Sequence, residues 1–456
     1  MKKTLALILS AGLIFQLAGC GSTEVAEDAS VAEGAVESTD SEETTLAMEY
    51  VTDENGETVT DEAGNPLMQE VKDDQEDVNL NFWYTDSNMT EYFTKCVEQF
   101  EAEHPHIQVT LSLVATSGYL ENIDLQSVHQ INAVDVYMLN NSDLEQAYLA
   151  GLAQPYDADV DVFTEANYGK SAMRAVTYYG KQIAYPLYFD SAFLVYNTNY
   201  VTQVPQTFDD ILIFSSQEVE EDSILNNMEK TMTWDVSNYK FNYVFLSDYF
   251  VMGGVSGDDR SYIDTNNDNV IAALTYYQAL YDFFAIDRKE LDKNGALTEF
   301  MEGKTAFTMA RIGDLPTLDE GKSTHENFDY GTAAMPDLTE NLPASSISYT
   351  QCLVVDPFSV HRKEAGEFVK AVCYDYVADF YGMTGFLPSR NNWNYSNPLY
   401  AGIYANYSDS TPVPKFFTLG DYYIELEILL HKVWDQDGEI TDLVNEFQDY
   451  ITNQIK

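Results

Sequence analysis

The feature that most constrains the fold is an alternation of strand and helix patterns that begins at Val78. Residues 78–83 alternate apolar and polar side chains, residues 90–103 carry apolar side chains at helical spacing, and residues 107–113 alternate again. A strand, a helix and a strand in this order form a βαβ unit, which implies a parallel sheet with a right-handed crossover. A further strand, 133–139, and a helix, 144–150, follow. The predicted fold class is therefore α/β. The chain from residue 78 onward is about 380 residues long, which exceeds a single core and predicts two lobes.

The first twenty residues predict a lipoprotein signal. Lys2 and Lys3 precede an uncharged, mostly apolar stretch, 4–17, which is shorter than the roughly 20 apolar residues that span a bilayer. The run 17–20, Leu-Ala-Gly-Cys, resembles the bacterial lipobox, and this implies that the Cys20 thiol carries a lipid anchor. An ordinary secretory signal with an incidental cysteine is the alternative.

Residues 21–77 predict an acidic, disordered tether. They contain 19 acidic residues, one lysine and almost no aromatic residue, so they cannot bury a core. A Val-Thr-Asp-Glu repeat starts at Val51 and again at Val59, with a turn dipeptide in each copy, and could form a small hairpin. The tether and the lipid anchor place the protein on the extracellular face of the cytoplasmic membrane, preferably of a Gram-positive cell. In a Gram-negative cell this would be the periplasmic face.

The charge of the chain restricts its partners. The formal net charge is −52, and outside the signal and the tether 56 acidic residues face 20 basic ones. Such a field repels nucleic acid and anionic ligands, so we expect no nucleic-acid partner. A neutral or cationic ligand fits better.

The remaining cysteines, Cys96, Cys352 and Cys373, are odd in number and lack a CxxC spacing. We interpret them as buried small apolar residues, with one disulfide as the alternative. The six histidines form no zinc pattern. We expect no metal and no cofactor.

One segment, 264–268, resembles the start of a calcium-binding loop. Its sixth position is Asn269 instead of glycine, and its twelfth is Thr275 instead of glutamate. We therefore predict a turn that caps a helix over 270–284.

Several short segments occur in a recognisable order along the chain. They are Phe82-Trp-Tyr-Thr-Asp-Ser87, Phe100-Glu-Ala-Glu-His-Pro105, Val134-Asp-Val136, Gly151-Leu-Ala-Gln-Pro155, Tyr179-Gly-Lys181, Ala184-Tyr-Pro186, Leu194-Val-Tyr-Asn197, Pro205-Gln-Thr-Phe-Asp-Asp210, Phe300-Met-Glu-Gly-Lys-Thr-Ala306, Tyr330-Gly331, Met335-Pro336 and Gly385-Phe-Leu-Pro-Ser-Arg390. Their order resembles that of family 1 extracellular solute-binding proteins, the maltose-binding-protein-like substrate-binding lipoproteins of carbohydrate ABC transporters.

This resemblance implies a periplasmic-binding-protein-like fold of type II, with two lobes joined by three crossings and a sugar bound between them. The implied lobes are 78–189 with 351–387, and 190–350 with 388–456. Hinge closure around the ligand would then present it to ABC-transporter permease subunits. We expect a monomer that binds a carbohydrate, an oligosaccharide by preference, without enzymatic activity.

The composition suits a sugar site, which combines aromatic faces with hydrogen-bonding side chains. The chain has 33 Tyr, 24 Phe and 4 Trp, although most Phe should belong to the core. Ligand contacts that carry over from the family are Tyr84, Asp86, Tyr188, Asp190, Trp234, Tyr239 and Tyr422. Three of them have structural alternatives: Tyr84 as a core residue, Asp86 as a helix N-cap, and Asp190 in a hinge or capping role. Trp234 is an alternative to Tyr239.

Two stacking tryptophans of the family are absent. One falls near Leu139, where Asn140 is the only polar neighbour, and the other falls near Gly313. This puts maltose itself in doubt and suggests another sugar. Arg311 could replace stacking by hydrogen bonds, or simply pair with Asp314. Tyr349 and Trp393 are possible new stacking residues.

Three rival functions stay open. A secreted glycan-processing enzyme would need two carboxylates about 5–9 Å apart across the cleft. A binding protein for a peptide, a polyamine or another cationic solute would suit the acidic charge. A surface glycan receptor without transport is the third.

Overall fold

The structure is a computed structural model, and it describes residues 48–50, 58–60, 66–70, 76–129, 134–156, 161–218, 220–221, 223–326, 328–392, 397–415 and 419–455. The chain divides into two compact units, Met1–Asp74 and Gln75–Lys456. In the first unit, β1 (Met48–Tyr50) pairs antiparallel with β2 (Met68–Glu70) on either side of the predicted repeat. Cys20 lies outside the described residues, and the disordered tether stays a prediction.

The predicted βαβ unit is present at the start of the second unit. Strand β3 (Val78–Tyr84) pairs in parallel with β4 (Ile107–Leu113) and β5 (Val136–Asn140). Helix α1 (Thr90–Glu103) connects β3 to β4 and buries the apolar face that its spacing predicts, namely Tyr92, Phe93, Cys96, Val97 and Phe100. The α/β fold class is thereby confirmed in this region.

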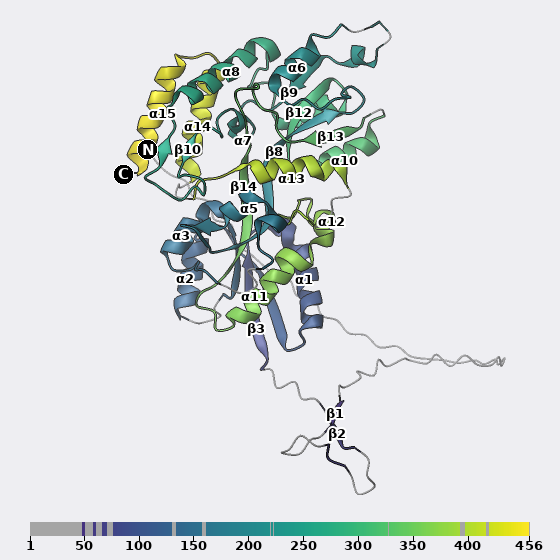
Figure 1. The fold of residues 1–456 in the computed structure, drawn as a ribbon, viewed down its shortest axis with the longest axis vertical. Helices are drawn as coiled ribbons and strands as arrows, with labels where there is room; N and C mark the ends of the chain where they lie inside the picture. The colour runs from purple at the N-terminus through teal and green to yellow at the C-terminus, as the bar shows by residue number, and fades with distance from the viewer. Residues whose placement is uncertain are drawn as a thin grey trace, which may run out of the picture. The chain divides into compact units, whose positions relative to one another are not determined.

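Two long strands form the middle of the main sheet, whose order is β4-β3-β5-β14-β8-β12-β9. The first part of β8 (Tyr185–Asn197) pairs antiparallel with β14 (Ile347–Val355). The rest of β8 pairs antiparallel with β12 (Thr305–Arg311) and β13 (Tyr330–Ala333). Strand β8 therefore changes partners near Asp190, and Figure 1 shows β8 and β14 running between two halves of this unit.

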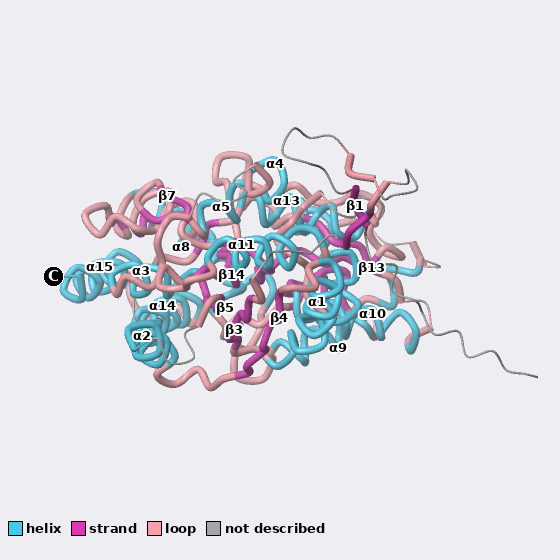
Figure 2. The backbone as a smooth tube through the Cα atoms, turned by 90° about the horizontal axis from the view of Figure 1, so that it is seen from below, coloured by secondary structure: helices cyan, strands magenta, loops and turns pink. Residues whose placement is uncertain are grey.

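We call the half around β3, β4 and β5 the first lobe, and the half around β9 (Lys230–Thr233), β12 and β13 the second lobe. Helices lie on both sides of the central strands (Figure 2). The second lobe is covered by α8 (Asp268–Phe284), α14 (Leu419–Trp434) and α15 (Ile440–Ile455). Trp234 and Trp434 pack edge-to-face in its core, with ring centroids 5.5 Å apart.

The other elements are shorter. The helices are α2 (Tyr119–His129), α3 (Leu144–Leu149), α4 (Glu165–Tyr168), α5 (Lys170–Ala175), α6 (Phe208–Ser215), α7 (Tyr239–Asn242), α9 (Lys293–Met301), α10 (Leu315–Thr324), α11 (Arg362–Lys370), α12 (Phe380–Thr384) and α13 (Pro398–Asp409). The strands are β6 (Thr177–Tyr178), β7 (Lys181–Gln182), β10 (Val251–Met252), β11 (Ile263–Asp264) and β15 (Thr411–Pro412).

Two smaller predictions are confirmed. Cys96, Cys352 and Cys373 are free and buried, so the disulfide alternative is wrong for these residues. Helix α8 is capped by Asn267, whose side chain accepts hydrogen bonds from the backbone N–H groups of Asn269 and Val270, as the turn interpretation requires.

None of the helices in the described ranges combines the length and apolar character that crossing a bilayer requires. In the same part of the chain no three His, Cys, Asp or Glu residues gather as metal ligands would.

Candidate functional site

Strand pairing brings residues that are far apart in the sequence into two adjacent rows of the sheet. Asn140 of β5 pairs with Gln351 of β14, which also pairs with Tyr188 of β8. Two residues along the strands, Tyr349 of β14 pairs with Asp190 of β8. Because side chains alternate along a strand, residues two apart on one strand share a face. The five residues named above therefore lie on one face of the sheet.

A cavity of about 350 Å³ lies at the carboxyl ends of the strands of the first lobe. Its polar lining includes Thr85, Thr116, Asn140, Asp143, Gln146 and Gln351. Thr85 follows β3 directly and Asn140 ends β5. In open α/β sheets, ligands bind beyond the carboxyl ends of the strands. Hydroxyl, amide and carboxylate groups can exchange hydrogen bonds with sugar hydroxyls here.

Asp86 links the edge of this cavity to the crossing strand. One oxygen of its carboxylate accepts the Tyr188 hydroxyl at 2.7 Å. The other accepts the backbone N–H of Asn88 at 3.0 Å and so caps the short 3₁₀ turn Ser87–Met89. The capping alternative for Asp86 is therefore present, one turn ahead of α1. Burial, reinforced by the negative charge of Asp86, raises the pKa of Tyr188 well above its usual value.

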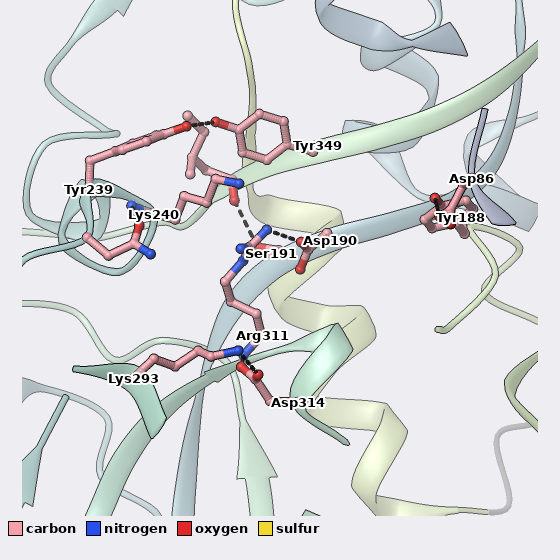
Figure 3. A network of polar contacts seen from close by, with 12 residues as sticks. Asp86, Tyr188, Asp190, Ser191, Tyr239, Lys240, Lys293, Arg311, Asp314 and Tyr349 are labelled. Atoms are coloured by element: carbon pink, nitrogen blue, oxygen red, sulfur yellow. Dashed lines mark hydrogen bonds and ion pairs between the residues drawn. The ribbon is translucent and has the colours of Figure 1, made fainter. Parts of the chain in front are cut away.

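Asp190 and Arg311 form an ion pair at the point where β8 changes partners (Figure 3). Arg311 Nη2 donates to Asp190 Oδ2, whereas Asp190 Oδ1 is buried and accepts no hydrogen bond of normal geometry; the backbone N–H of Ile312 lies near enough to this carboxylate to lower its pKa. Burial raises the pKa of Asp190, and the positive charges of Arg311 and Lys240 oppose that rise. A buried acceptor without a partner is costly, and a ligand hydroxyl or amine could satisfy it.

The alternative pairing of Arg311 with Asp314 does not involve the guanidinium. Asp314 accepts the backbone N–H of Arg311 at 2.9 Å and pairs with the Lys293 ammonium at 2.6 Å. The Arg311 side chain is thus directed to Asp190 by the fold (Figure 3).

Two tyrosines and a lysine lie above this ion pair. The hydroxyls of Tyr239 and Tyr349 are 2.6 Å apart, and the Tyr239 ring stacks on Tyr423 at 4.5 Å between centroids. The Lys240 ammonium lies 4.8 Å from the centroid of the Tyr349 ring. Burial lowers the pKa of Lys240, and the positive charge of Arg311 lowers it further. Figure 3 shows Lys240 pointing toward Tyr349 and Arg311.

Three candidates are instead core residues in this structure. Trp234 is fully buried, and its indole N–H donates to Asn242 at 2.9 Å. Tyr84 is buried against Phe93, which is its core alternative. Tyr422 is likewise buried. None of the three offers an open ring face to a sugar, because a fully packed ring has no surface left for stacking. Trp393 lies outside the described residues.

Lys240 and Tyr423 were not predicted from the sequence. Each is the immediate neighbour of a candidate, Tyr239 and Tyr422 respectively. Tyr239 begins the short helix α7, whose first turn is capped by the Asn238 side chain and directs Lys240 toward β14. The only sequence signal for these two residues was that each lies next to a ligand contact implied by the family resemblance.

Known proteins resemble this chain over most of its length. The family model described as "Bacterial extracellular solute-binding protein" matches residues 95–399. A "Maltooligosaccharide ABC transporter solute-binding lipoprotein" of Streptococcus pneumoniae (strain R6) is 24% identical over 58% of this chain and 65% of its own length. The chain therefore aligns with just under two thirds of that relative. "Maltodextrin-binding protein MdxE" of Bacillus subtilis is 22% identical over 80% of this chain and 88% of its own.

Solved structures show the same fold. An extracellular solute-binding protein from Staphylococcus aureus in complex with maltose superposes with a TM-score of 0.72 at 20% identity, covering 84% of this chain and 98% of its own. A cyclo/maltodextrin-binding protein complexed with maltotetraose gives 0.70 at 18% identity, over 84% and 99%. These neighbours have the two-lobe type II periplasmic-binding fold, and so does this chain.

Proposed function

We infer the function from the premise that the chain belongs to the bacterial extracellular solute-binding proteins. The protein captures a carbohydrate outside the cell, closes its two lobes around it and delivers it to the permease subunits of an ABC importer. The names of its relatives refer to maltooligosaccharide and maltodextrin binding, which supports a saccharide as cargo. These relatives are named as binding proteins, which supports the proposal that this protein binds its cargo without turning it over.

The single observation that carries this proposal is the polar surface at the point where β8 and β14 cross between the lobes. Asp190 and Tyr349 face each other there on the two crossing strands. Asp190 also holds Arg311, which extends from β12 of the second lobe. These three residues belong to the second lobe, so a ligand that contacts them and also Asp86 or Asn140 of the first lobe touches both lobes. Only such contacts can favour a closed state over an open one. The exchange of strand partners supports lobe boundaries near 189/190 and 350/351.

The residues we propose for binding lie at that crossing or at the adjoining end of the first lobe. They are Asp86, Asn140, Tyr188, Asp190, Tyr239, Arg311 and Tyr349. The Tyr188 ring is buried, so its role is the hydroxyl that it donates to Asp86. Tyr84, Trp234 and Tyr422 support the site from the core. Cys20 carries the lipid that anchors a monomeric protein to the extracellular face of the membrane, with residues 21–77 as the spacer.

A thermal-shift screen tests the proposal. The chain from residue 20 onward, with Cys20→Ser to prevent lipidation, is heated with mono- and oligosaccharides, and with peptides and polyamines for comparison. A ligand that binds only the native state raises the melting temperature by mass action. We expect a rise with one glycan class and no turnover of it. A rise of the melting temperature with polyamines or peptides alone would mean that the cargo is a cationic solute and not a carbohydrate. Turnover of a sugar would mean that the protein is an enzyme.

A further inference from the structure

We propose that the saccharide bound at this site carries an anionic substituent, a carboxylate or a phosphate, which contacts Lys240 and Arg311. This inference rests on the proposed function and adds the chemical class of the cargo. It departs from the expectation, drawn from the net charge, that anionic ligands are repelled.

The first observation is that two cations, Lys240 and Arg311, lie close together (Figure 3), and that of the two Arg311 is the one with an ion pair among the described residues. Arg311 pairs with Asp190 through Nη2, and the Lys240 ammonium lies over the face of the Tyr349 ring. Among the described residues, Lys240 has no ion pair and its ammonium makes no hydrogen bond. An ammonium has three donors and is costly to hold without acceptors when it is partly buried.

The second observation is the electrostatic strain on Lys240. Its pKa is lowered by burial first and by Arg311 second, whereas Asp190 and Glu427 act in the opposite direction and more weakly. Among the described residues, neither carboxylate forms an ion pair with the Lys240 ammonium. An anionic group of the ligand would accept hydrogen bonds from the ammonium and relieve this repulsion.

The third observation is the donor geometry of Arg311. A guanidinium presents five N–H donors in a planar fork that matches carboxylate and phosphate oxygens. The bond to Asp190 uses Nη2, so the fork is fixed in direction while other donors remain for a ligand. About a fifth of the Arg311 side chain is exposed (20%), and so is a similar part of Asp190 (23%). The pair is thus accessible from solvent.

The overall acidity of the chain does not oppose such binding at close range. Charges on the protein surface are screened beyond a Debye length of about 8 Å at physiological salt. The other charged residues of this region are Glu427, which acts on Lys240 without an ion pair to it, and Lys293 and Asp314, which pair with each other. Within hydrogen-bond distance of the ligand, the Lys240 ammonium and the remaining N–H groups of Arg311 are the donors for an anionic group. The chain has only 23 Lys and Arg residues, and two of them converge here.

The test uses matched probes that differ only in charge. The chain with Cys20→Ser is titrated with oligogalacturonates of two to four units, glucuronate-containing disaccharides and a disaccharide phosphate. Each is paired with its neutral counterpart, the methyl ester or the dephosphorylated sugar. We expect at least one acidic probe to bind about tenfold or more tighter than its neutral counterpart, which is the usual size of a charge-assisted hydrogen bond. The arm that binds distinguishes carboxylate from phosphate.

Variants then assign the preference to these residues. Lys240→Met should abolish most of it and reduce the salt dependence of binding. Lys293→Met is the matched control, since it removes a lysine of the same region that pairs with Asp314, and should keep the preference. Neutral counterparts that bind as tightly as the acidic probes would overturn this inference and leave the proposed function intact. Binding of no saccharide at all would overturn both.

Discussion

Desolvated carboxylates lie at the far end of the first lobe and at the crossing point between the lobes, and they differ in how completely they are partnered. At the end away from the site, Asp135 precedes β5 and Asp356 follows β14. Asp135 accepts hydrogen bonds from the Ser359 hydroxyl and the Asn81 N–H, and Asp356 accepts from the Ser127 hydroxyl and the Phe358 N–H.

Asp190, at the crossing point, is different because one of its oxygens is buried without a partner. Burial raises the pKa of all three carboxyl groups. A raised pKa alone therefore does not mark a binding residue here. We propose that the missing partner does: carboxylates with complete hydrogen bonding hold the fold, and the incomplete one awaits a ligand.

The largest expected effect on stability comes from removing a carboxylate whose hydrogen bonds are complete. Asp135→Ala leaves the Asn81 N–H and the Ser359 hydroxyl without their acceptor. We expect the free energy of unfolding to fall by about 4 kcal/mol, the range for removing one partner of a buried charged contact. Urea denaturation measures this. Asp379→Ala is the control, because Asp379 is 66% exposed in a surface pair and should cost under about 1 kcal/mol. Equal losses in both variants would contradict the comparison.

The pH dependence of stability tests the same end of the lobe. Burial raises the pKa of Asp356 to about 6, so the folded state binds a proton more tightly than the unfolded state. Stability from this group is complete below about pH 4 and is lost as the pH rises through about 6, a change of about 3 kcal/mol. Between pH 4 and pH 7, Asp356→Asn should therefore gain about that much stability relative to the unmodified chain. Parallel profiles for the two proteins would show that Asp356 titrates normally.

The contrast between complete and incomplete partners also explains what the sequence could predict. The βαβ unit followed from local periodicity, because β3 and α1 each bury one face. The Asp190–Arg311 pair joins residues 121 positions apart and depends on the register of β8 with β12, which no local pattern encodes. Trp234 is a second example of what the sequence alone does not determine. Its residue type suits a sugar site and a core equally, and only the packing of the second lobe assigns it to the core.

Substitution of the incompletely partnered carboxylate should affect binding more than folding. Asp190→Ala removes the free acceptor and the group that directs Arg311. We expect the affinity for the saccharide identified in the screen to fall about 30-fold, or about 2 kcal/mol, since a hydrogen bond to a charged group is lost. The melting temperature should change little, because Arg311 is partly exposed and can be hydrated. Calorimetric titration and thermal denaturation measure the two effects separately. A large loss of stability with unchanged affinity would make Asp190 a structural residue.

The smallest expected effect tests whether the role of a polar group in the site depends on its hydrogen-bond partner or on its position. Tyr349 lies beside Asp190, but its hydroxyl is already bonded to the Tyr239 hydroxyl at 2.6 Å. If partnering decides the role, Tyr349→Phe should lower the free energy of unfolding by about 1 kcal/mol, the usual worth of one hydrogen bond, and change the affinity less than about threefold. Tyr276→Phe removes a comparable hydroxyl, bonded to Asp209 at 2.9 Å away from the site, and should lower stability by a similar amount. A tenfold loss of affinity in Tyr349→Phe alone, at unchanged stability, would mean that position at the crossing strands decides the role of a polar group, whatever its partners.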